Sequence, residues 1–206
     1  MIPPEVGLSF FGAAVILALA PGPDNIFVFT QAAVTGPAGG LMVTLGLCTG
    51  LMVHTSAVAL GVAALFETSP VAFIFLRWVG AGYLLYLGWL AFRDSAENGD
   101  MESPQPINMG ILYRRGMIMN VTNPKVSIFF LAFLPQFADP ARGSLTVQLM
   151  LLGGVFIIAT VLVFGTVALL AGSVGKSLLG SARSKRIMNQ TAGTVFVVMA
   201  LSIVYF

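Results

Sequence analysis

Apolar residues in this chain are grouped into six long stretches, and short polar connections separate them. The stretches lie at about 6–34, 41–66, 71–92, 112–137, 145–170 and 187–206. Each is long enough to cross the hydrocarbon core of a bilayer as a helix. Most connections are short and rich in glycine and proline, so consecutive helices should be antiparallel. The pattern predicts an all-α membrane protein with six transmembrane helices.

The first stretch is too long for one straight crossing, and its middle contains helix-breaking residues. A continuous helix over it would measure roughly 43 Å, against a hydrocarbon core of about 30 Å. Pro21 and Pro23 each lack a backbone donor, and Gly22 relaxes the backbone limits. Backbone groups freed in lipid must be satisfied by protein, water or a ligand. A break beside Asp24 and Asn25 therefore predicts a polar cavity and a candidate binding site.

The fourth stretch contains a similar break. Asn123-Pro124-Lys125 repeats the order of Gly22-Pro23-Asp24, in which an uncharged residue precedes a proline and a charged residue. About ten apolar residues follow each triplet. Pro124 should therefore open the helical ladder as Pro23 does.

The longest connection divides the chain into two halves with three stretches each. It runs over about 93–111 and is rich in acidic residues and proline. The halves, about 5–92 and 112–206, would form one membrane domain over all 206 residues. Because each half has an odd number of crossings, the second would enter from the opposite side, as in transporters with inverted repeats. Asp24 and Lys125 would then face each other near the midplane, unless the two breaks and the two charges coincide by chance.

The composition places the chain in a bilayer. It is 57% hydrophobic and 9% charged, with a mean hydropathy of +0.94, whereas soluble proteins contain about 25% charged residues. The net charge of +2 is spread over loops, which argues against nucleic-acid binding. A single cysteine, Cys48, excludes an intrachain disulfide, and with one histidine the chain offers no typical zinc cage. We expect no metal and no cofactor.

The basic residues predict the orientation of the chain. Seven of the ten would lie on one side of the membrane: Arg93, Arg114, Arg115, Lys176, Arg183, Lys185 and Arg186. By the positive-inside rule that side is cytoplasmic, so both termini should be periplasmic. The N-terminus has only Glu5 as an early charge and lacks the basic flank of a secretory signal, so the first stretch should be retained in the mature protein.

Three ionisable residues lie near the middle of predicted spans: Asp24, His54 and Lys125. A charge at a helix centre costs about 2.5–3.5 kcal/mol on insertion, so such residues are usually functional or paired. Asp24 is a candidate ligand for a substrate ammonium or a candidate proton carrier. Alternatively it forms a fixed ion pair with Lys125 that only joins the two halves. Lys125 is the candidate counter-charge, and it would bind a substrate carboxylate when released from Asp24.

His54 follows a stripe of small residues on the second stretch. Gly46, Gly50 and His54 are spaced at four-residue steps, with Gly61 further along. Glycines at this spacing typically allow a neighbouring helix to approach closely. His54 is then either a hydrogen-bonded packing residue or a proton relay near the site.

Four amide side chains surround the two breaks: Asn25, Gln31, Asn120 and Asn123. Gln31 shares a helix face with Asp24, and Asn120 shares one with Asn123. These amides would either contribute to a substrate site or hold helices together by hydrogen bonds.

Taken together, these motifs resemble the LysE/RhtB family of bacterial amino-acid exporters, within the LysE superfamily. The resemblance rests on the Pro-Gly-Pro-Asp of residues 21–24, the glycine stripe with His54, Gly-Ala-Gly-Tyr-Leu-Leu-Tyr-Leu-Gly at 80–88, Asn120 with Asn123-Pro124-Lys125, and Leu-Pro-Gln-Phe at 134–137. It covers about residues 5–140 with motifs in order. It implies a multi-pass inner-membrane exporter of amino acids or related metabolites, driven by a proton or ion gradient, without a cofactor. It places the site at Asp24, Asn25, Asn123 and Lys125.

Three other classes fit the chain less well. A cation or metal-ion exporter on the same scaffold is weakened by the scarcity of acidic and histidine ligands. A membrane enzyme would need several titratable groups clustered at the interface. A structural subunit would make the breaks accidental. The expected partners are a small amino-acid-like substrate and the lipid bilayer, and the glycine faces would serve a homodimer as well as internal packing.

Overall fold

The computed structural model describes residues 2–20, 22–68, 70–93 and 108–178, and several helical residues between 186 and 201. Over this part of the chain every regular element is helical. The α-helices are α1 (Pro4–Leu19), α2 (Pro23–Thr35), α3 (Pro37–Thr68), α4 (Pro70–Arg93), α5 (Met109–Thr122), α6 (Pro124–Ile128) and α7 (Leu145–Leu178). Between α6 and α7 lie a π-helical turn, η1 (Phe129–Phe133), and two 3-10 turns, η2 (Leu134–Phe137) and η3 (Pro140–Arg142). The all-α prediction is confirmed for these residues.

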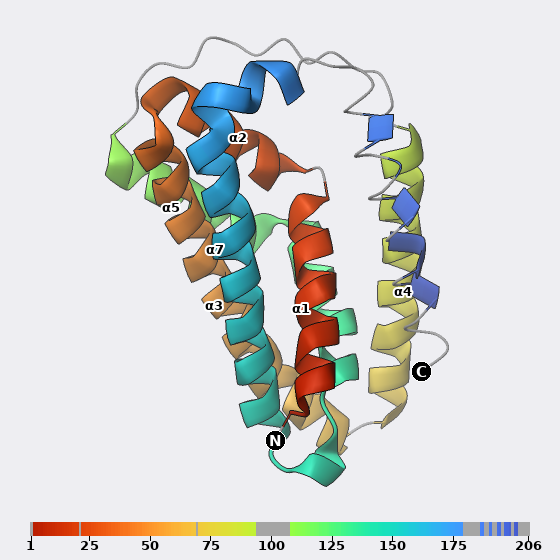
Figure 1. Cartoon of the computed structure of the whole chain (residues 1–206). Helices are drawn as coiled ribbons and strands as arrows, with labels where there is room; N and C mark the ends of the chain where they lie inside the picture. Colours follow the sequence, from red (N-terminus) through yellow and green to blue (C-terminus); the bar gives the residue numbers. More distant parts are fainter. Residues whose placement is uncertain are drawn as a thin grey trace.

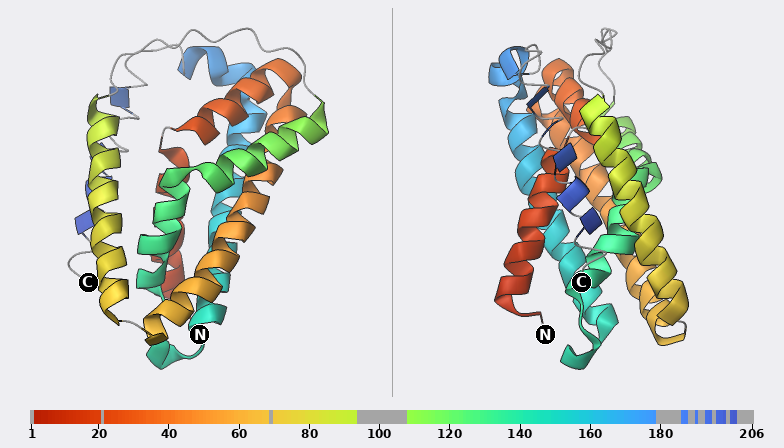
Figure 2. Two further views of the ribbon diagram at one scale, coloured as in Figure 1. Left: turned by 180° about the vertical axis from the view of Figure 1, so that it is seen from behind. Right: turned by 90° about the vertical axis from the view of Figure 1, so that its right-hand side faces the viewer.

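The two predicted breaks appear as bends between consecutive helices. The axes of α1 and α2 differ by 65°, and the axis of α5 differs by 50° from that of the segment Pro124–Phe137. Pro23 and Pro124 start the second helix of each pair. Proline is favourable there because the first backbone N–H of a helix has no intrahelical partner. Figure 2 shows the bend between α5 and α6.

The described helices give two to four candidate membrane spans. Residues Pro37–Gly61 of α3 and Leu145–Ala171 of α7 are long and apolar enough to cross alone, and each bent pair could form one further span. The helix α4 covers the third predicted stretch and contains a shorter apolar part, Trp78–Leu90. Most of the predicted 93–111 connection and much of the 187–206 stretch fall outside the described residues, so six crossings stay a prediction.

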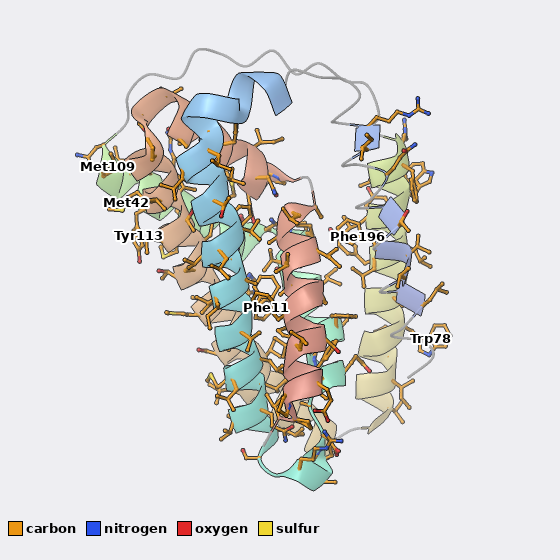
Figure 3. The ribbon with its side chains drawn as sticks, viewed as in Figure 1. Phe11, Met42, Trp78, Met109, Tyr113 and Phe196 are labelled. Atoms are coloured by element: carbon orange, nitrogen blue, oxygen red, sulfur yellow. The ribbon has the colours of Figure 1, made fainter. Side chains whose placement is uncertain are left out.

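The helices α2, α5 and α7 pack around α3, and α1 packs against α7 (Figure 1). The helix α4 lies at the edge of the molecule, where Gly80 meets Ala132 of η1 and Gly88 faces the backbone of Gly193. Figure 3 shows Trp78 projecting outward from α4, and its side chain is 61% exposed. An exposed apolar face of this kind is what contact with lipid requires.

Two hydrophobic clusters form the core, and α1 ends at their junction. Leu17 belongs to a cluster rich in phenylalanine, whereas Ala18 belongs to a second cluster with Val28 and Leu47. The break between α1 and α2 follows within two residues of this junction. The buried Asp24 therefore follows directly after the place where the two clusters meet.

Candidate functional site

Asn123 links the two breaks. Its Oδ1 accepts a hydrogen bond from the backbone N–H of Lys125 at 3.0 Å, which caps the N-terminus of α6. Its Nδ2 donates to Oδ2 of Asp24 at 3.0 Å. Asp24 is 3% exposed and lies in the first turn of α2. One amide side chain thus joins the start of α6 to the carboxylate at the start of α2.

Lys125 points to the end of α1. Its Nζ donates to the carbonyl oxygens of Ala20 at 3.1 Å and Leu17 at 3.4 Å. The last carbonyls of a helix have no intrahelical partner and carry the negative end of the helix dipole, so they favour a cation. A Cβ atom at Gly22 would lie 3.1 Å from Nζ, so the glycine leaves room for the ammonium.

The contact between Asp24 and Lys125 is indirect. Among the described residues no ion pair within 4.0 Å joins them, but their charges are close enough to interact. Asn123 binds the carboxylate, and the end of α1 binds the ammonium. The structure therefore brings the two charges together without a direct salt bridge. We call Asp24, Asn123 and Lys125 the Asp24 cluster.

The helix α3 supports this cluster through Asn120. His54 Nε2 lies 3.1 Å from the carbonyl oxygen of Asn120, which also accepts a hydrogen bond from the backbone N–H of Asn123 at 3.0 Å. A Cβ atom at Gly50 would lie 2.6 Å from Oδ1 of Asn120. The glycine stripe thus lets α5 approach α3, since Gly46 likewise lies against the backbone of Tyr113.

Gly50→Ala is expected to destabilise the protein by about 1–3 kcal/mol, because the added methyl group overpacks the contact with Asn120. Gly61→Ala on the same helix is the matched control, since a Cβ there meets nothing within 4 Å. That change should stabilise the helix by up to about 1 kcal/mol. Detergent unfolding curves of the two variants test the difference. Equal stability would mean that α3 and α5 do not pack through Gly50.

The structure places the remaining predicted residues around the cluster. Asn25 Nδ2 donates to the carbonyl oxygen of Ala18 at 2.7 Å, which ties α2 back to α1. Gln31 is buried further along α2, and no contact between described residues connects its side chain to Asp24. Pro21 lies outside the described residues.

Two oxygen atoms at the start of α2 are buried without a hydrogen-bond partner among the described residues. They are Oδ1 of Asp24 and Oδ1 of Asn25. Both are acceptors, and an unmatched buried acceptor is costly. A ligand with several N–H donors, such as an ammonium group, would satisfy them.

Sequence reasoning missed two buried polar residues of α7. Thr160 Oγ1 has no partner among the described residues, and Gln148 is 3% exposed. Both are polar residues inside the apolar 145–170 stretch, and this contrast could have identified them from the sequence. Within the described residues no three His, Cys, Asp or Glu side chains lie close enough together to hold a metal ion.

Comparison with known proteins adds independent information. The sequence profile of the family described as "LysE type translocator" matches residues 15–206. An "Uncharacterized membrane protein" of Vibrio cholerae is 33% identical over 93% of both chains. Proteins of Salmonella typhi and Salmonella typhimurium, each named "Homoserine/homoserine lactone efflux protein", are 32% identical over 95% of this chain and 94% of theirs. No solved structure matches this chain.

Proposed function

This chain belongs to the LysE type translocator family, and from that premise we propose that it exports a small amino-acid-like metabolite across the bacterial inner membrane. The export is secondary active transport, driven by a proton or ion gradient. The observation that carries the proposal is Asp24, a buried carboxylate at a bend between two helices, with one oxygen that has no hydrogen-bond partner among the described residues. Such a group in a membrane segment is functional or paired by default.

The substrate class follows from the charge that Asp24 offers. Homoserine and its lactone both carry an amino group, but only homoserine has a free carboxylate. Asp24 supplies the complementary charge for an ammonium, or it carries the coupled proton. Lys125 serves as its counter-charge, and Asn123 holds the carboxylate through a hydrogen bond from its side-chain amide. His54 positions Asn120 through the contact with its carbonyl oxygen.

The two bent helix pairs support alternating access. In each pair a proline starts the second helix, and the charged residue follows it. We propose that residues of about 5–92 and 112–206 form two inverted repeats with six crossings in total. The distribution of basic residues supports periplasmic termini. Movement of one repeat against the other would expose Asp24 to each side in turn.

Ligand-induced stabilisation in detergent tests the substrate class. A ligand at about 100 times its Kd stabilises the folded state by about 2.7 kcal/mol. Homoserine and homoserine lactone are expected to raise the Tm, whereas 4-hydroxybutyrate, which lacks the amino group, should not. Homoserine counterflow in proteoliposomes then tests transport. Absence of both stabilisation and counterflow with a panel of amino acids and lactones would contradict the proposal.

A further inference from the structure

A cavity that opens to the surface lies at the end of the molecule where α1 begins, and both apolar and polar side chains line it. Its volume is about 360 Å³, within the range of about 300–1,000 Å³ that is usual for small-ligand sites. The side chains that give it chemical character are Glu5, Ser9, Gln136, Phe137, Asp139 and Arg142. Figure 1 shows the start of α1 and the segment that precedes α7 at this same end of the molecule.

One wall of the cavity is held in place by Gln148. Its Nε2 donates to the carbonyl oxygens of Asp139 at 2.9 Å and Gly143 at 3.0 Å. Its Oε1 accepts from the backbone N–H of Asp139 at 3.1 Å. Because Gln148 is buried in α7, these bonds fix the 139–143 segment to the body of the protein. The wall is therefore preorganised.

The cavity lies at the far end of the same two segments that form the Asp24 cluster. Along α1, the residues run from Leu17, which binds Lys125, through Phe10 to Glu5. Along the other segment they run from Lys125 through Phe129 to Phe137, which lines the cavity.

An aromatic plug separates the cavity from the cluster. We use this name for Phe10, Phe129, Phe133, Phe137 and Phe156. Phe10 lies 5.9 Å from Phe129 and 5.1 Å from Phe137, measured between ring centroids. Phe129 also contacts Phe133 and Phe156. The rings of Phe10 and Phe129 are fully buried, so the structure is closed between the cluster and the cavity.

Among the described residues that line the cavity, carboxylates outnumber cationic side chains. Asp139 and Arg142 pair at 3.0 Å, and Glu5 adds a second carboxylate from α1. An excess of carboxylate favours a cationic group, and the serine and glutamine side chains add hydrogen-bonding capacity.

We propose that this cavity is a second site for the substrate, which binds its ammonium group through Glu5 when the substrate leaves on the periplasmic side. The inference rests on the proposed function and on the periplasmic placement of the termini. Substrate passes from Asp24 to the cavity when the aromatic plug opens, and the exposed carboxylate of Glu5 holds it weakly enough for release.

Site-directed labelling tests the second site. In a Cys48→Ala background, Ser9→Cys places a thiol in the cavity, and Ser144→Cys places one on the same loop region outside its lining. Both should react with a membrane-impermeant thiol reagent added to intact cells. Homoserine at about ten times its Kd should slow labelling of Ser9→Cys about tenfold by mass action. Labelling of Ser144→Cys should be unchanged.

Two further variants separate this site from the Asp24 cluster. Adding Glu5→Gln should remove the protection by homoserine, whereas adding Asp24→Asn should leave it intact. Protection that is lost in Asp24→Asn would overturn the inference, because it would report closure of the transporter from the central site. Normal homoserine counterflow without protection would overturn the second site and leave the proposed function standing. Protection without any counterflow would support the site and contradict the proposed function.

Labelling also tests on which side of the membrane the cavity opens. Reaction of Ser9→Cys only after the cells are permeabilised would place the cavity on the cytoplasmic side. That result would overturn its assignment to substrate release.

Discussion

Asp24→Asn is expected to lower homoserine counterflow at least about 100-fold, which corresponds to about 2.7 kcal/mol. The change keeps the shape of the side chain and an oxygen that Asn123 can bind, but it removes the charge that binds a substrate ammonium. Lys125 keeps its contacts with Leu17 and Ala20, so the variant should stay folded. Proteoliposome counterflow, together with a thermal unfolding curve, measures both effects.

The same variant distinguishes the two roles of Asp24. If the carboxylate binds the substrate ammonium, Asp24→Asn loses both homoserine exchange and gradient-driven accumulation. If it carries only the coupled proton, exchange survives and accumulation is lost. A variant that retains both activities at the wild-type rate would remove Asp24 from the mechanism.

The positions of the helices could be predicted from the sequence because they depend on local chemistry. The predicted 41–66 and 145–170 stretches lie within α3 and α7. Pro23 and Pro124 marked the starts of two helices, since proline fits only the first turn of a helix without breaking it. Long apolar runs and proline positions are visible without knowledge of tertiary contacts.

The partners of the charged side chains could not be predicted in this way. Opposite charges on two breaks suggested a direct contact between Asp24 and Lys125. The sequence does not reveal that the carbonyls of Leu17 and Ala20 end a helix beside Lys125, or that Asn123 reaches Asp24. These contacts depend on the packing of α1 against the second break, which joins residues that are distant in the chain.

The π-helical turn was also beyond sequence analysis. Residues 129–133 form an apolar run in which nothing marks a departure from the α-helix. By contrast, the glycine stripe predicted a close helix approach, and the structure supplied its partner, α5. Gln148, which the sequence analysis missed, acquires a role only through its hydrogen bonds to the 139–143 segment.

Lys125→Met is expected to destabilise the protein by about 3–5 kcal/mol, a larger effect than that of Asp24→Asn. Methionine fills a similar volume but leaves the carboxylate of Asp24 without its nearby positive charge. It also leaves the carbonyls of Leu17 and Ala20 without a donor. Unfolding in detergent measures the loss of stability, and Lys125→Arg, which retains the charge, is the control.

The double variant Asp24→Asn/Lys125→Met separates these two contributions. Removing the second charge should recover about 2 kcal/mol of the loss, because no unpaired buried charge remains. The uncapped end of α1 should account for the residual cost of about 1–3 kcal/mol. Transport should stay absent, since the charge that binds the substrate or the proton is gone. If the double variant is no more stable than Lys125→Met, the two charges are not coupled, and Lys125 stabilises only the end of α1.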